Sequence, residues 1–477
     1  LKGAIAIIDA RLAAVIDQLA GLEARDGAIE TLAHTRMQAA IPVPASRKIA
    51  SWREPLERHR ERFAPVREDV CVLHFGGAAG TLEKLKWAVA YGADAVYFGL
   101  EFGSLRSFAG NLTLDDAEEG LGYLHARGKK GYVTLNIYPF SEEIDRLADT
   151  ACTLDAMGVD GLIVADLGLL AVLRQRKLKA ALHISTQANT TNAAAALAYA
   201  RLGAARVNLA RELSLTQIQD ICTQTRGQIE TEVFIHGAVC FSYSGRCAIS
   251  DYLTGSRANR GECKHPCRWK YALVEETRPG DYMPVMEDER GLYLFNSKEL
   301  ALFDYIPALC KMGVGSLKIE GRMKSIHYLA AVVSLYRRIL DGTPFTSQQA
   351  LAWLGRVPNR GYSAGFIKGS ITPDDYEWNR SNSEGDSLFV GEVEAMSNAK
   401  CQMLNVKGDG CIIRVRNKIR AGQTLEVLTP DGALSTLTLP DPLETVDGLW
   451  LDTVQNEQRL RLPTPLPPYS LLRALLD

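Results

Sequence analysis

The sequence lacks long apolar runs and any recognisable export signal. No stretch of about 18 consecutive apolar residues is present to form a membrane span. The opening segment, LKGAIAIIDARLAAVIDQLAGLEAR, does not have the charged, apolar and small regions that follow one another in a signal peptide. We therefore expect a soluble, cytoplasmic protein without a membrane association.

A large net charge and two common hydrolase motifs are also missing. The formal net charge of -2 at pH 7 excludes an electrostatic field over the whole molecule that would attract nucleic acid, so any RNA site must be local. Neither HExxH nor GxSxG occurs, so neither a metalloprotease nor a serine hydrolase is indicated. The length of 477 residues suffices for two or three domains.

Helical patterns alternate with short apolar runs over roughly residues 81–341. This alternation is typical of repeated βα units. We predict strands at residues 70–75, 95–99, 131–136, 161–166, 181–186, 206–211, 232–237 and 316–321. Eight nearly continuous apolar strands favour an α/β fold with a closed (β/α)8 TIM-like barrel over an open doubly wound sheet.

The pattern divides the chain into four parts. We predict a helical N-terminal extension at residues 1–69, the barrel at 70–342, a linker at 343–385 and a small all-β barrel domain at 386–477. Residues 238–315 separate the seventh barrel strand from the eighth and form an insertion. Long insertions on the catalytic face of a barrel commonly carry functional residues.

Polar residues gather at the carboxyl ends of the predicted strands, where barrels carry their chemistry. The candidates for catalysis are Asn136, Gln187, His236 and Glu320. Each residue alone also fits an ordinary hydrogen-bonding cap. Their shared position favours a catalytic site at this end of the barrel.

Four of the ten cysteines crowd into the insertion. They are Cys240, Cys247, Cys263 and Cys267, with six, fifteen and three residues between successive members. In a cytoplasmic protein such a group is better explained by metal binding or catalysis than by disulfides. Four thiolates from one segment can bind a tetrahedral zinc ion or a four-iron cluster. The wide, irregular spacing favours an iron-sulfur cluster, with zinc as the alternative.

Two other interpretations of these cysteines stay open. Free cysteines are often buried as small apolar residues, which we expect for the six scattered outside the insertion group. Cys240 and His236 can also form the nucleophile pair of a thiol-dependent peptidase. Because a nucleophilic thiolate cannot be a cluster ligand in the same state, the two hypotheses compete for Cys240.

The insertion also contains a local basic patch. Between residues 246 and 271, six basic residues stand against two acidic ones, with Tyr252 and Trp269 among them. Basic and aromatic side chains together are typical of RNA-binding surfaces. We name Arg260, Arg268 and Trp269 as candidates for substrate binding, and a solvated loop without a partner is the alternative.

A series of segments in order resembles one known family. The segments include GTLEKLKWAVAYGADAVYFGLEFGSLRSFAGN, HISTQANTTN, NLARELSL, EVFIHGAVCFSYSGRC, ANRGECKHPCRWKY, RPGDYMPVMEDERGLYLFNSKEL and SLKIEGRMKS. They resemble the collagenase-like peptidase family of unassigned mechanism, in its branch of bacterial tRNA uridine hydroxylation proteins. The resemblance extends from about residue 80 to the C-terminus.

The resemblance implies a tRNA-modifying enzyme that forms 5-hydroxyuridine at the wobble position. It implies a 4Fe-4S cluster on Cys240, Cys247, Cys263 and Cys267. The tRNA branch is associated with prephenate as the source of the hydroxyl group. Arg106, Arg211 and Arg322 are cations near the predicted strand ends that can hold carboxylates.

The resemblance also leaves the reaction partners and two other functions open. A partner protein or an electron donor is a further expected component. The family's historical label gives a collagenase-like, thiol-dependent peptidase as the first alternative. A noncatalytic RNA-binding module is the second.

The first 80 residues do not fit that family. Their sequence from ETLAHTRMQAAIPVPASRKIASW onward is similar to a fragment of the carboxymuconate cycloisomerases of the fumarase/aspartase superfamily. His34 and Thr35 stand at the position of that superfamily's substrate-binding pair. Its serine loop and most of its helical bundle are missing, so we expect no lyase activity. Residues 70–75 must then supply the first barrel strand.

Overall fold

The computed structural model describes most of the chain. The described residues are 2–34, 39–69, 72–76, 81–104, 111–240, 242–243, 245–260, 262–268, 273–274, 282–283, 286–288, 291–293, 297–376, 384–394 and 410–476. They form two compact units, one made of residues 1–72 with 340–343 and the other of the remaining chain. Within the described part, no helix is long and apolar enough to cross a membrane.

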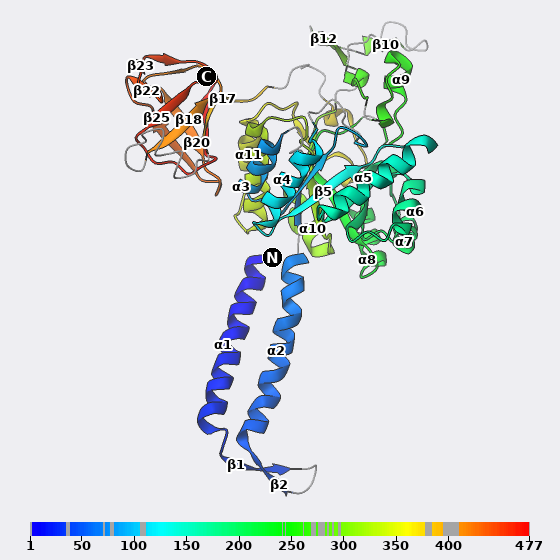
Figure 1. Ribbon diagram of the computed structural model, residues 1–477, viewed down its shortest axis with the longest axis vertical. Helices are drawn as coiled ribbons and strands as arrows, with labels where there is room; N and C mark the ends of the chain where they lie inside the picture. The colour runs from blue at the N-terminus through cyan, green and yellow to red at the C-terminus, as the bar shows by residue number, and fades with distance from the viewer. Residues whose placement is uncertain are drawn as a thin grey trace. The chain divides into compact units, whose positions relative to one another are not determined.

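The first unit is built on two long helices that lie side by side (Figure 1). Helix α1 (Lys2–Asp26) and helix α2 (Ala45–Asp69) are joined by the antiparallel strands β1 (Glu30–His34) and β2 (Ala39–Pro44). Ion pairs of 2.9 Å join Arg53 to Glu23 and Arg60 to Asp9 across the two helices. Two helices lie in the segment for which a helical extension was expected, and the two short strands were not predicted.

The second unit contains a mixed α/β sheet whose main strands run parallel. These strands are β3 (Val72–Gly76), β4 (Ala95–Gly99), β5 (Lys130–Leu135), β6 (Gly161–Val164), β7 (Ala181–Ile184), β8 (Arg206–Asn208), β9 (Glu230–Gly237) and β15 (Ser316–Ile319). Successive pairs from β3 to β9 are parallel, as is the pair β9–β15. Because β15 neighbours both β3 and β9, these strands form a ring. All eight predicted strands are present.

Helices alternate with the strands and lie around them (Figure 1). They are α3 (Leu82–Ala90), α4 (Leu114–His125), α5 (Ile144–Ala156), α6 (Leu167–Gln175), α7 (Ala193–Arg201), α8 (Leu215–Thr225), α10 (Ile306–Met312) and α11 (Ile326–Leu340). Local sequence sets their starts, since Thr113 and Ser214 each form a capping box. Their apolar faces and the strands make one buried core, to which Leu85, Leu121 and Leu154 contribute.

Two short strands extend this sheet beyond the ring. Strand β14 (Glu299–Ala301) pairs antiparallel with the end of β9 and parallel with β16 (Tyr362–Ser363). The first part of the insertion contains helix α9 (Ile249–Thr254) and the short hairpins β10–β11 and β12–β13. Their bounds are Leu273–Val274, Tyr282–Met283, Met286–Asp288 and Gly291–Tyr293. The insertion therefore adds strand β14 at the carboxyl end of β9.

The C-terminal domain is an antiparallel half-barrel reached through helix α12 (Ser347–Gly355). Its main sheet has the order β21-β20-β26-β17-β18-β25-β22-β23. The strands are β17 (Ser387–Val393), β18 (Cys411–Val415), β20 (Thr424–Leu428), β21 (Leu434–Thr438), β22 (Leu443–Thr445), β23 (Trp450–Leu451), β25 (Arg459–Leu462) and β26 (Leu471–Leu475). A separate pair joins β19 (Ile419–Arg420) to β24 (Thr453–Val454). The core contains Val390, Ile413 and Val427.

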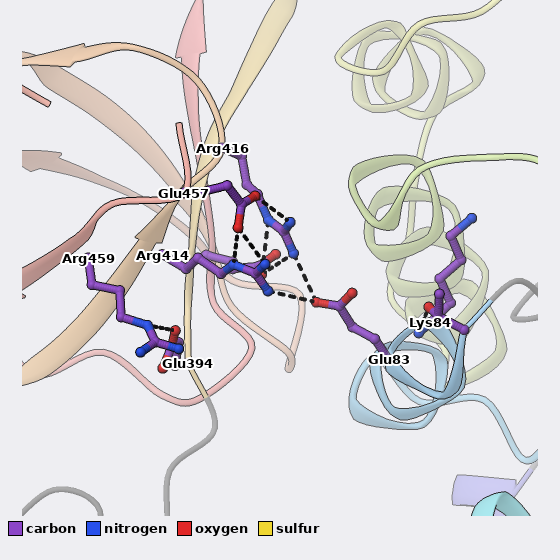
Figure 2. A network of polar contacts seen from close by, with 9 residues as sticks. Glu83, Lys84, Glu394, Arg414, Arg416, Glu457 and Arg459 are labelled. Carbon is purple, nitrogen blue, oxygen red and sulfur yellow. Dashed lines mark hydrogen bonds and ion pairs between the residues drawn. The ribbon is translucent and has the colours of Figure 1, made fainter. Parts of the chain in front are cut away.

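Helix α3 contacts the C-terminal half-barrel through aromatic and ionic groups. The Tyr91 hydroxyl lies 2.9 Å from the carbonyl oxygens of both Leu428 and Tyr469. The Trp87 ring meets the Tyr469 ring edge-on at 5.5 Å. Figure 2 shows Arg416 between Glu83 of α3 and Glu457 of the half-barrel, at 2.9 and 3.3 Å. The second unit thus includes a specific contact between ring and half-barrel.

Candidate active site

Charged residues lie inside the strand ring. Glu232 of β9 accepts hydrogen bonds from Lys318 of β15, at 2.9 Å, and from Ser316, at 2.8 Å. The Arg206 guanidinium of β8 is 3.6 Å from the same carboxylate, and all three charged side chains are at most 6% exposed. Burial lowers the pKa of Lys318, against the opposing effect of Glu232. These ions hold neighbouring strands in register below the polar end of the ring.

Glu320 and Arg322 follow β15 at that polar end, which we call the mouth. Tyr97 of β4 donates a hydrogen bond of 2.9 Å to the Glu320 carboxylate. Burial, and then the nearby Glu320 charge, raise the pKa of Tyr97 well above its ordinary value. Tyr97 therefore stays a neutral donor that holds Glu320 in place.

Arg322 is 3% exposed and reaches across the mouth. Its guanidinium donates to Thr134 at 3.3 Å, to Asn111 at 3.4 Å and to the Ser104 hydroxyl. Asn136, from the end of β5, donates to Ser185 at 3.2 Å. Three of the predicted residues thus lie in one buried polar layer with hydroxyl and amide neighbours.

Gln187 joins the mouth to the cysteine-bearing segment. Its carbonyl oxygen accepts a 2.5 Å hydrogen bond from Tyr138. A Cβ added at Gly245 would lie 2.3 Å from this carbonyl and 2.9 Å from the Tyr138 hydroxyl. Gly245, which lies between Cys240 and Cys247, therefore packs directly against the Gln187 carbonyl, and a larger residue would not fit there.

His236 faces a different environment from the mouth residues. The β9–β15 register shifts between Lys318 and Ile319, and this bulge places His236 beside α11. Its Nδ1 is 3.2 Å from the Tyr336 hydroxyl, and its ring contacts those of Tyr328 and Tyr362. Burial lowers the pKa of His236 to about 3, so the imidazole is neutral.

The His236 tautomer follows from its partner. Tyr336 donates its single proton to the Ile235 carbonyl at 2.9 Å, so Nδ1 of His236 must be the donor to Tyr336. Nε2 of His236 has no hydrogen-bond partner in the described part of the chain. No hydrogen bond therefore joins His236 to Cys240, as the nucleophile-pair hypothesis would require.

The four insertion cysteines differ in exposure. Cys240 is exposed, and Cys247, Cys263 and Cys267 are half-buried. The Cys247 backbone is fixed by Asn259, which accepts from its N–H at 3.4 Å and donates to its carbonyl at 2.9 Å. The His265 N–H donates to the Cys263 sulfur at 3.4 Å. An N–H donor of this kind stabilises a thiolate and tunes cluster potentials.

The donor chemistry of this segment fits a four-iron cluster, because its four cysteines follow β9 on one excursion of the chain. Among the described residues, however, no three histidine, cysteine, aspartate or glutamate side chains are gathered as a metal site.

The basic residues named from the sequence have different positions. Arg260 donates to the Tyr138 carbonyl at 2.8 Å and to Glu143 at 2.6 Å, so it anchors the insertion to the loop after β5. Arg211 donates to the Ala238 carbonyl at 3.0 Å and lies over the Phe234 ring. Arg106 and Trp269 lie outside the described residues, as does the Arg268 side chain.

Sequence reasoning missed Tyr97, Tyr138 and the internal charges around Glu232. The signal for the charges was the presence of ionic residues within three predicted buried strands, one each in RVN and SLKI and two glutamates in ETEVFIHG. A charge that alternates with apolar residues on a buried strand must meet a partner inside the sheet. Tyr138 carried no comparable signal, because its role depends on the path of the insertion.

Comparisons with known proteins decide the family. Residues 80–376 match the model of Peptidase family U32, and residues 386–473 match that of the Peptidase family U32 C-terminal domain. The chain belongs to peptidase family U32. Neither matched range extends below residue 80, and the likeness of the N-terminal segment to carboxymuconate cycloisomerases stays a prediction.

Two similar curated relatives are tRNA hydroxylation proteins. The tRNA hydroxylation protein P of Escherichia coli (strain K12) is 36% identical, over 75% of this chain and 86% of the relative. The tRNA hydroxylation protein P1 of Bacillus subtilis (strain 168) is 35% identical, over 83% of this chain and 93% of the relative. The solved U32 peptidase Mk0906 shares 16% identity and a TM-score of 0.35, over 53% of this chain and 93% of that one.

Proposed function

We propose that this U32 family member is a tRNA-hydroxylating enzyme that forms 5-hydroxyuridine at the wobble position. The similarity to tRNA hydroxylation proteins over most of their length supports this substrate class. We further propose that the strand ring is a (β/α)8 TIM-like barrel, with the reaction at its mouth. The observation that carries the proposal is the contact of the cysteine-bearing segment with Gln187 at this mouth.

The proposed cofactor is a 4Fe-4S cluster held by Cys240, Cys247, Cys263 and Cys267, with zinc as the alternative. Placing a hydroxyl group on a pyrimidine carbon is an oxidation, and a bound cluster supplies one-electron transfer. The Cys263 sulfur already accepts a hydrogen bond from the His265 N–H, the kind of contact that cluster-bound sulfurs commonly make.

The mouth residues support binding of a small oxygen-rich molecule beside the base. Arg322 brings a buried positive charge, and Tyr97 holds Glu320 as a hydrogen-bond acceptor. Prephenate, the proposed source of the hydroxyl group, carries carboxylates that Arg322 and Arg211 can bind. Because this hydroxylation removes two electrons from the base, we propose that a partner protein exchanges electrons with the cluster and accepts these two.

Two measurements test the proposal, one on tRNA from a deletion strain and one on the purified protein. We expect tRNA from a strain lacking the gene to lack 5-hydroxyuridine, and the wild-type gene to restore it, as measured by nucleoside mass spectrometry. Chain purified without oxygen should contain about four irons, the content of one cubane cluster, and Cys240→Ser should lose iron and complementation together. Cys222→Ser is the matched control, because this buried thiol lies on α8.

Other outcomes would point elsewhere. A colourless preparation that binds one zinc ion would contradict the redox cofactor. RNA binding without any change in the nucleosides would indicate a noncatalytic RNA-binding module. Peptide cleavage that survives chelators and requires Cys240 would indicate the peptidase alternative.

A further inference from the structure

Two exposed aromatic rings stand beside the mouth in the described structure. Phe140, in the loop after β5, is 49% exposed, and Tyr243, in the cysteine-bearing segment, is 58% exposed. Large apolar rings exposed at this level near a polar site are candidates for a binding surface. Tyr138 links the two, because it belongs to the Phe140 loop and its hydroxyl would lie 2.9 Å from a Cβ added at Gly245.

The Phe140 ring is held in place by a closed set of contacts. The Phe140 N–H donates to Glu143 at 2.7 Å, and Glu143 accepts from Arg260 at 2.6 Å. The Arg260 guanidinium then lies 4.1 Å from the centre of the Phe140 ring. The hydrogen bond from Arg260 lowers the pKa of Glu143, so this support is charged at neutral pH. Arg260 therefore contacts part of the Phe140 ring, while about half of the side chain remains exposed to solvent.

Exposed cations flank the two rings. Arg257 is exposed and lies 5.7 Å from the centre of the Phe140 ring, and Arg246 is exposed and follows Tyr243 in the same turn. An exposed acid is present as well, since Glu142 lies two residues after Phe140. A phosphate beside Glu142 would be repelled, whereas an uncharged base on the ring would not. This arrangement favours base stacking at Phe140 and phosphate contacts at the arginines.

We propose that Phe140 is a stacking platform for an unpaired base of an RNA loop, with Tyr243, Arg246 and Arg257 binding the neighbouring nucleotides. Proteins that recognise single-stranded RNA stack splayed bases on aromatic and arginine planes, while A-form duplexes do not expose base faces. The inference deepens the proposed function, on which it rests, because it states how a loop nucleotide reaches the mouth. It assigns Phe140 a positioning role.

Fluorescence anisotropy with full-length protein tests the platform. The probes are a labelled RNA stem–loop and a fully paired duplex of the same strand length. We expect Phe140→Ala to weaken stem–loop binding about 5- to 100-fold, the range for loss of one stacked base, and to leave duplex binding unchanged. Phe140→Trp should retain binding, because it restores a stacking face.

A matched variant separates stacking from loss of any exposed ring. Trp450 is 61% exposed on β23 of the half-barrel, so Trp450→Ala should leave stem–loop binding unchanged. Arg257→Gln should lower the salt dependence of binding, by about 0.7 in the log–log slope for one single-strand phosphate contact. Thermal unfolding of each variant checks that the fold is intact.

Each result bears on the inference separately from the enzyme's activity. Equal stem–loop binding by wild type and Phe140→Ala, no binding by wild type, or equal losses for stem–loop and duplex would each overturn the platform. Weaker stem–loop binding by Phe140→Ala without any hydroxylated nucleoside from wild type would support the platform and contradict the proposed reaction.

Discussion

Gly245 fixes how closely the cysteine-bearing segment approaches the strand ends. Its φ of +73° lies in the left-handed region, where a side chain is strained, and its missing Cβ leaves room for the Gln187 carbonyl. A backbone carbonyl at 2.3 Å cannot rotate aside as the end of a long side chain can. The single residue therefore controls the distance between Cys247 and the mouth.

Substitution of Gly245 should destabilise the cysteine-bearing segment more than the strain of a positive φ alone would. Gly227 has the same φ of +73° but no atom within 4 Å of an added Cβ, which makes it a matched control. We expect Gly227→Ala to cost about 1–2 kcal/mol of unfolding free energy. Gly245→Ala should lose at least as much stability. Unlike Gly227→Ala, it should also exchange amide hydrogens faster in residues 245–260 and bind less iron. Equal behaviour of the two variants would contradict the packing of this segment against Gln187.

His236 should make the protein less stable in mild acid. Burial lowers its pKa to about 3, below the ordinary value of about 6.5 in an unfolded chain. Between these values the unfolded chain binds a proton that the folded protein does not, so stability is complete above about pH 6.5 and falls as the pH falls toward 3. The contribution is at most about 1.4 kcal/mol per pH unit.

The pH dependence of unfolding measures this contribution. The free energy of unfolding in urea should be measured at pH 7 and at pH 5. The decrease from pH 7 to pH 5 should be smaller for His236→Gln than for wild type. His59→Gln, which removes an exposed imidazole from α2, is the control and should behave as wild type. An unchanged loss in His236→Gln would mean that the buried imidazole is protonated in the folded state.

At the scale of elements, the alternation of apolar strands and helices was sufficient to predict the ring strands. Strand 95–99 was predicted with its observed bounds, because the wholly buried AVYFG comes shortly after Gly92 and ends on Gly99. The segment 206–211 was predicted too long, since β8 ends at Asn208, whose side chain donates to Glu232. Periodicity thus locates a strand better than it locates the strand's end.

Features that depend on a single extra residue were not predictable. The β9 bulge at Ile235 turns His236 toward α11, yet its sequence EVFIHG reads as an ordinary buried strand. Strand β14 was not predicted within the insertion, because it forms only by pairing with β9, which is distant in the sequence. The cysteine group was visible from spacing, whereas its contact with Gln187 required the folded path.

At the scale of the whole second unit, two kinds of contact join α3 to the half-barrel. Trp87 and Tyr91 are 3% and 1% exposed, so their rings are removed from water. Glu83 keeps 43% of its side chain exposed while it pairs with Arg416 (Figure 2). Exposed ion pairs stabilise by less than about 1 kcal/mol, whereas a buried tryptophan contributes several. Aromatic packing should therefore dominate this contact.

Three substitutions rank these contributions. Trp87→Ala should cost about 3–5 kcal/mol and detach the half-barrel, which small-angle X-ray scattering would record as a larger radius of gyration. Tyr91→Phe keeps the ring but leaves the Leu428 and Tyr469 carbonyls without this donor, so a loss of about 1–3 kcal/mol is expected. Glu83→Gln should change the unfolding free energy by less than about 1 kcal/mol, and only at low salt. If Glu83→Gln instead opened the contact and Trp87→Ala did not, the ionic network would be the element that positions the half-barrel.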